Sequence, residues 1–185
     1  MRRRYLFAVL CLFVALAAFD IAEGVSASTI CMSSLPFNID AATLQPVAVA
    51  LLQRSPTFQK QCMRIASTVV LRVTIRVVPT TASGRAQTTI TRYDAGALRA
   101  EVLIRFGEDY YELLAHELEH VLEQVDGVVL SADILSDRAW VTGSGAFETR
   151  RAFDAGMRVR QECDEFAAEA IQANRYNSPR PKGRD

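Results

Sequence analysis

The sequence predicts a mixed α+β domain. In it, a short antiparallel sheet packs against helices that precede and follow its strands in the sequence. Two observations lead to this fold class. Residues 68–106 hold three runs of alternating or β-branched residues separated by short turns, a pattern typical of strands. The flanking segments, residues 46–66 and 109–173, instead carry apolar residues at helical spacing. The short connections between the strands favour an antiparallel meander.

The first 27 residues have the pattern of a secretory signal peptide. Arg2-Arg3-Arg4 is a basic start, an apolar run follows from Tyr5 to Ala18, and Val25-Ser26-Ala27 supplies small residues for cleavage. The apolar run is short for a membrane span. We therefore expect cleavage after residue 27, with an uncleaved anchor as the alternative. After removal of the signal we expect no stable membrane insertion, a single domain over residues 28–176 and a disordered tail over residues 177–185.

Composition limits the class of partner. The chain carries 21 basic and 21 acidic side chains, and no basic stripe or RNA-binding motif stands out. We therefore expect no binding to nucleic acid. Export permits disulfides, and Cys31 and Cys62 both lie in the N-terminal part, so we expect them to pair. Cys163 is then expected to be a small buried apolar residue.

Two short helices are expected before the strands, over residues 46–54 and 56–66. Pro46 and Pro56 suit the first turn of a helix, and Ser55 suits the N-cap of the second one. The strands follow at residues 68–78, 87–93 and 98–106. The turns between them are expected at Ser83-Gly84 and at Asp94-Ala95-Gly96.

A long helix is expected from about residue 109 to residue 126. The acidic Glu108 and Asp109 suit a helix N-terminus, and Asp126-Gly127 is a normal ending. Residues 128–144 look irregular, and a second long helix is predicted from about Ala146 to Ala173. The apolar stripe of the first helix is Leu114, Leu118, Val121 and Val125.

The chain has only two histidines, and they form a recognisable motif in the first long helix. His116 and His120 are four residues apart, and Glu117 directly follows the first, which gives H-E-x-x-H. Positions four apart share one face of a helix, so both imidazoles can reach one zinc ion. Glu117 then stands beside the metal as a general base. The alternative is a charged, solvated face, because the histidines lie opposite the apolar stripe.

A catalytic zinc generally takes three protein ligands, and with no further histidine the third must be a carboxylate. Glu148 is the preferred candidate, because the inward stripe of the second long helix extrapolates back through it and a carboxylate there needs a partner. Glu162 lies deeper near the same stripe. Glu123 lies on the histidine face of the first long helix, where it is better placed to hold a metal ligand in position than to bind the metal itself. The alternative for Glu148 is a residue of the first turn that only favours the helix N-terminus.

At this point the chain resembles the zincin metallopeptidases, in particular the gluzincin branch, in which two histidines and a glutamate hold the metal. The resemblance rests on His116-Glu117-Leu118-Glu119-His120 and on the order of strands, motif helix, loop and second helix, over roughly residues 68–170. It implies a zincin-like fold and a Zn²⁺ cofactor. Gluzincins often carry an Asp four residues after the ligand Glu, and Ala152 stands at that position here.

The resemblance implies an exported, periplasmic or secreted, zinc metallopeptidase that hydrolyses a peptide or protein substrate. Glu117 would take a proton from zinc-activated water, and the substrate would add a strand along residues 98–106 or their neighbour. Two other functions stay open: a non-catalytic envelope protein stabilised by zinc, and a metal-free secreted interaction domain. Candidate oxyanion donors are Tyr110, Tyr111, Tyr176 and Arg150.

Overall fold

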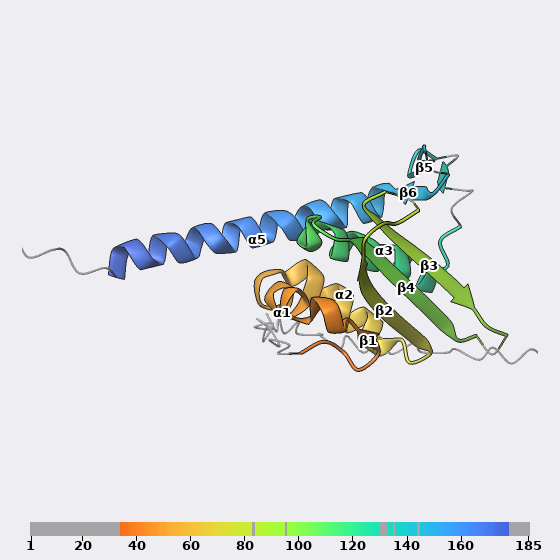
Figure 1. The fold of residues 1–185 in the computed structure, drawn as a ribbon, viewed down its shortest axis with the longest axis horizontal. Coiled ribbons are helices and arrows are strands. Elements are labelled where there is room, and N and C mark those ends of the chain that lie inside the picture. Colours follow the sequence, from red (N-terminus) through yellow and green to blue (C-terminus); the bar gives the residue numbers. More distant parts are fainter. Residues whose placement is uncertain are drawn as a thin grey trace, which may run out of the picture. The chain divides into compact units, whose positions relative to one another are not determined.

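The computed structural model describes residues 34–177, apart from residues 83, 95, 130–132, 135 and 144. The predicted signal peptide, Cys31 and the tail from residue 178 lie outside the described residues. The described part is a mixed α+β structure, as predicted (Figure 1). None of its helices combines the length and the apolar character that crossing a membrane requires.

The helices before the sheet form where the sequence predicts them. After β1 (Ile39–Asp40) and a short 3-10 helix, η1 (Ala42–Leu44), the chain forms α1 (Gln45–Arg54) and α2 (Pro56–Ser67). Ser55 Oγ accepts a 3.0 Å hydrogen bond from the Phe58 amide, so it is the predicted N-cap of α2.

The four-stranded sheet has the order β1-β2-β4-β3, with β2 (Leu71–Val78), β3 (Ala86–Arg92) and β4 (Leu98–Arg105) close to their predicted positions. The predicted antiparallel meander is wrong, because β2 pairs in parallel with β4, and within this sheet only β3 and β4 form an antiparallel hairpin. The fully buried Ala100, Val102 and Ile104 favour the centre for β4. The threonine-rich β3 takes the edge, where polar side chains are tolerated.

One face of the sheet packs against the helices. Alternate residues of β2 and β4 join a core with α1, α2, α3 and α5, whereas Arg72 and Arg99 lie exposed on the opposite face. Cys62 and Cys163 are buried free thiols of this core. Cys31, the expected partner of Cys62, lies outside the described residues. Burial raises the pKa of the Cys62 thiol to about 12, so the thiol stays protonated and acts as a small apolar core residue.

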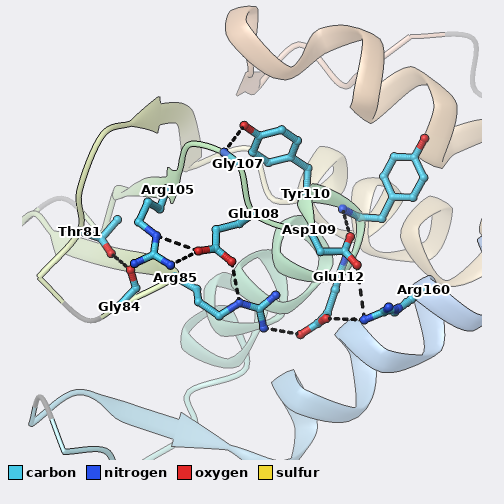
Figure 2. Close-up of polar contacts among 11 residues, drawn as sticks. Thr81, Gly84, Arg85, Arg105, Gly107, Glu108, Asp109, Tyr110, Glu112 and Arg160 are labelled. Atoms are coloured by element: carbon cyan, nitrogen blue, oxygen red, sulfur yellow. Dashed lines mark hydrogen bonds and ion pairs between the residues drawn. The ribbon is translucent and has the colours of Figure 1, made fainter.

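Helix α3 (Tyr110–Val125) carries the histidine motif and begins in a network of charged side chains (Figure 2). Asp109 Oδ1 caps the helix by accepting hydrogen bonds from the amides of Tyr111 and Glu112. Arg85, just before β3, bonds both Glu108 and Glu112, at 3.0 and 3.1 Å. These contacts fix the first turn of α3 against the edge of the sheet.

A hairpin that sequence analysis did not predict precedes the last helix. β5 (Ala139–Val141) pairs with β6 (Phe147–Thr149), and α5 (Arg150–Asn177) begins directly afterwards. The predicted start of this helix at residue 146 is therefore wrong. Thr149 Oγ1 accepts a 3.0 Å hydrogen bond from the Ala152 amide, which places the cap of α5 at residue 149.

Helix α5 approaches α3 very closely at one point. Gly156 has no side chain, and a Cβ added there would lie 3.0 Å from the Glu112 carbonyl oxygen and 3.2 Å from His116 Cβ. The glycine therefore sets how near α5 comes to the first histidine of the motif.

Candidate metal centre

The two histidines of α3 face the same space. Their ring centroids lie 4.9 Å apart with the ring planes at 80°, and both side chains are largely covered. The alternative of a solvated charged face is wrong, because Glu117, Glu119 and Glu123 on α3 are 4%, 9% and 2% exposed. These acidic side chains are buried and therefore need partners.

Glu148 supplies a carboxylate opposite the two rings. Its Oε2 lies 3.0 Å from His116 Nε2 and 3.9 Å from His120 Nε2. Within the described part of the chain, these three residues offer donor atoms that all lie within 4.8 Å of one another. Glu148 reaches this place from β6, paired with Trp140, and not from the first turn of a helix as expected.

A buried carboxylate orients the second imidazole. Glu123 Oε2 lies 2.9 Å from His120 Nδ1, and Glu123 Oε1 accepts a 2.6 Å hydrogen bond from Thr149 Oγ1. Because Nδ1 donates to Glu123, Nε2 is the ring nitrogen that can bind a cation once it has lost its proton. His120 Nε2 is buried and has no hydrogen-bond partner, as expected for an atom that awaits a ligand.

Glu117 lies beside this cluster with a single neutral partner. Thr88 Oγ1, from β3, donates a 2.6 Å hydrogen bond to Glu117 Oε2. Burial raises the pKa of Glu117 above its usual range, and the Thr88 hydrogen bond and the two histidines oppose this rise. A carboxylate in this position can take up and release a proton.

The charges of the centre are unbalanced without a cation. Among the described residues, no Lys or Arg forms an ion pair with Glu117, Glu123 or Glu148. Burial disfavours a charged His120, but the hydrogen bond to Glu123 and the nearby Glu148 outweigh it and raise its pKa to about 10. Burial likewise opposes ionisation of Glu148, yet the two histidines lower its pKa to about 2. In the metal-free protein a proton on His120 therefore supplies positive charge.

The cluster opens into a groove of about 520 Å³. One wall is the edge strand β3 and the other is the turn between β5 and β6. Its lining includes Ala82, Gln87, Thr88, Ile90, Glu117, His120, Gly145, Ala146, Phe147 and Glu148.

The other candidates lie elsewhere. Glu162 accepts hydrogen bonds from Ser55 Oγ, Thr57 Oγ1 and the Thr57 amide, so it supports the start of α2 and is not a third ligand. Tyr110 OH accepts from the Gly107 amide, and Tyr111 OH accepts from Arg54. Neither tyrosine lines the groove, nor does Arg150. The side chain of Tyr176 lies outside the described part.

Three supporting residues were not predicted. Thr88 contacts Glu117, Thr149 contacts Glu123, and Arg151 Nε donates a 2.6 Å hydrogen bond to Glu119 Oε1. Of these, only Thr149 carries a local signal, since a threonine before a helical run is a typical N-cap. The other two contacts depend on tertiary packing.

The donor set fits a divalent metal. Two imidazole Nε2 atoms and one carboxylate oxygen lie close together, and a His₂Glu set is one of the common protein contributions to a catalytic zinc site. No family model, no curated protein and no solved structure matches this chain. The case for function therefore rests on the geometry of the site.

Proposed function

We propose that the protein is an exported zinc-dependent metallopeptidase of zincin-like fold. One observation carries the proposal: the donor atoms of His116, His120 and Glu148 converge, and His120, Glu148 and the neighbouring Glu117 line an open groove bordered by an edge strand. A structural zinc site is generally closed by four protein ligands, so three donors facing a groove favour catalysis over a purely stabilising role. Export rests on the N-terminal sequence pattern alone.

His116, His120 and Glu148 would hold the metal, and Glu123 would keep His120 in the correct tautomer. Zinc in such a site lowers the pKa of water and polarises a carbonyl. Glu117 would accept the proton of the attacking water on the carboxylate that Thr88 orients and would pass it to the leaving amine. The raised pKa of Glu117 suits both transfers.

The edge strand supports an extended peptide as the substrate. Arg105 N donates to Arg85 O and Tyr93 N donates to Ala97 O, so odd-numbered residues of β3 bond to β4. Thr88 and Ile90 therefore point their main-chain groups away from β4, and both line the groove. A peptide could pair with these two residues as an added strand. This assigns the substrate edge to β3, because β4 is internal.

The test combines metal analysis with a peptide library. Glu117→Gln should keep stoichiometric zinc and lose at least about 100-fold in kcat/KM, because the general base is removed. His120→Ala should lose both zinc and hydrolysis. Glu101→Gln, on β4, is the control and should change neither.

The result also separates the other functions. Stoichiometric zinc without hydrolysis of any library peptide would favour a zinc-stabilised, non-catalytic protein. Absence of bound zinc after mild purification and zinc titration would favour a metal-free interaction domain. Unchanged hydrolysis by Glu117→Gln would contradict the mechanism.

A further inference from the structure

Three turns at one end of the sheet carry exposed apolar side chains. Phe37 lies in the turn before β1, Val69 and Val70 form the turn before β2, and Tyr93 begins the turn after β3. The parallel register of β1 with β2, and the hydrogen bond from the Leu98 amide to the Val70 carbonyl oxygen, put the three turns at the same end of the sheet, to which the arrow of β3 points (Figure 1). We call these four side chains the apolar rim.

The residues of the apolar rim are unusual for turns that face water. The exposed fractions are 75% for Phe37, 73% for Val69, 52% for Val70 and 50% for Tyr93. Val69 and Val70 take the two central positions of a β-turn that the Leu71 amide closes with a 3.0 Å hydrogen bond to the Thr68 carbonyl oxygen. Gly, Pro, Asn, Asp and Ser are the usual residues of such turns. Apolar side chains gathered in their place indicate an apolar partner.

Two arginines lie directly behind the apolar rim. Arg72 of β2 and Arg99 of β4 are paired in register and are exposed on the face of the sheet away from the helices. Like charges in directly opposite positions repel. Glu101, on the same face, pairs with Arg76 at 3.5 Å, and among the described residues neither Arg72 nor Arg99 forms an ion pair. A phosphate between the two guanidinium groups would relieve the repulsion, and its geometry matches them.

The order of apolar and basic groups along the strands matches the layers of a phospholipid surface. Arg72 follows Val70 by two residues, which is about 7 Å along a strand. Apolar groups that bind at a membrane surface enter about 5–10 Å into the boundary between headgroups and acyl chains. When the apolar rim enters this boundary, Arg72 and Arg99 therefore lie at the level of the phosphates. A nucleic acid supplies phosphates but no hydrocarbon for the two valines.

We propose that the apolar rim, together with Arg72 and Arg99, docks the protein on the surface of a bilayer that contains anionic phospholipid. The contact is peripheral and reversible, and it weakens with added salt. Asp94, in the turn after Tyr93, opposes the attraction. Ala82 and Ala86, which line the groove, lie at the other end of β3, so a docked bilayer leaves that end of the groove open. The proposal does not depend on the metal centre.

Tryptophan emission from the apolar rim tests the docking. Trp140→Phe removes the only native tryptophan, and Tyr93→Trp in the same chain places a probe in the apolar rim. The probe is needed because the apolar run of residues 5–18 is itself able to enter a bilayer. The emission of this variant should shift to the blue with vesicles of phosphatidylcholine and about one-third phosphatidylglycerol. It should shift little with phosphatidylcholine alone, and added salt should reverse the shift.

Further substitutions in this probe variant identify the contacts. Val69→Ser with Val70→Ser keeps residues suited to a turn and should raise the lipid concentration for half the shift at least about 10-fold. Arg72→Gln with Arg99→Gln should also raise it at least about 10-fold, because each arginine near an anionic surface contributes about 5-fold. Asp94→Asn should lower it.

A second pair of substitutions is the control for charge. Lys60→Gln with Arg158→Gln removes the same net charge from exposed positions on α2 and α5 and should leave the lipid concentration for half the shift unchanged. Equal effects of the two charge pairs would overturn the proposal. No shift with the mixed vesicles, or an equal shift with phosphatidylcholine alone, would overturn it too. A shift with single-stranded DNA but not with vesicles would assign the surface to nucleic acid and would also overturn it.

Discussion

Thr149 and Glu123 are joined by a 2.6 Å hydrogen bond between the threonine hydroxyl and the carboxylate that orients His120. The same hydroxyl accepts the Ala152 amide at the start of α5. The Thr149 hydroxyl thus contacts both the start of α5 and the Glu123 carboxylate that orients His120. Because Thr149 directly follows Glu148, this contact links the candidate ligand on β6 to the candidate ligand on α3.

Replacing Thr149 should weaken metal binding. Thr149→Val removes the hydroxyl with little change in volume, so Glu123 loses a partner and His120 loses its fixed orientation. We expect about 10- to 100-fold weaker Zn²⁺ affinity, measured by competition with a chromophoric chelator. Thr149→Ser keeps the hydroxyl and should restore the affinity; a Val variant that binds as tightly as the unmodified protein would refute this role.

Thr88 should control the pH at which Glu117 works. Its hydrogen bond stabilises the ionised carboxylate, so Thr88→Val should raise the pKa of Glu117. A base must be deprotonated, and the acidic limb of kcat/KM should therefore move to higher pH, with zinc content unchanged. Thr88→Ser should return the limb to its original position. If the profile of the Val variant does not move, Thr88 is not coupled to the base.

The metal-free protein should show a pH window of stability set by the centre. The pKa of His120 is raised to about 10, so its contribution is complete below the unfolded value of about 6.5 and is lost as pH rises toward 10. The pKa of Glu148 is lowered to about 2, so its contribution is present above the unfolded value of about 4.5 and is lost as pH falls toward 2. Urea midpoints of chelator-treated protein should therefore be highest between about pH 4.5 and 6.5.

His120→Ala provides the control for that window. This variant should lack the fall in stability toward high pH that deprotonation of His120 causes. An unchanged dependence of the urea midpoint on alkaline pH would contradict the assignment of that fall to His120. Zinc binding near neutral pH should also release a proton from His120. Calorimetry in buffers of different ionisation enthalpy measures this release.

Gly156 should be intolerant of a side chain. Gly156→Ala brings a Cβ to 3.0 Å from the Glu112 carbonyl oxygen, so α5 must move away from α3. We expect a loss of about 1–3 kcal/mol in the free energy of unfolding, together with weaker zinc binding. Gly143→Ala is the matched control, because nothing lies within 4 Å of a Cβ there. Equal urea midpoints for both variants would contradict the close packing.

Sequence patterns located most helices and strands because apolar periodicity and caps are local. They did not give the pairing of strands, since the position of β4 between β2 and β3 depends on which strand the helices bury most deeply. The polar composition of residues 86–92 was the available sign of an edge strand. The β5–β6 hairpin was missed because each strand has only three residues, too few to show a period.

For the candidate site, the histidine motif followed from spacing, but the neighbours of its side chains did not. Glu148 was selected from a helical stripe, although it lies on a strand that ends where the helix begins. The residue lies near the rings because β6 leads directly into α5, which packs along α3. The contacts of Glu123 with Thr149 and of Glu119 with Arg151 join segments distant in sequence, so no local sequence pattern predicts them.

The place of Glu148 on a hairpin gives the centre two unequal halves. The imidazoles belong to a helix of 16 residues, whereas the carboxylate belongs to a ribbon of two three-residue strands. An ion bound to both would act as a staple that closes a chain loop from His120 to Glu148, with the entropic benefit of a cross-link. Loss of the ion should then speed hydrogen exchange first at the amides of the ribbon, while the amides of α3 stay protected.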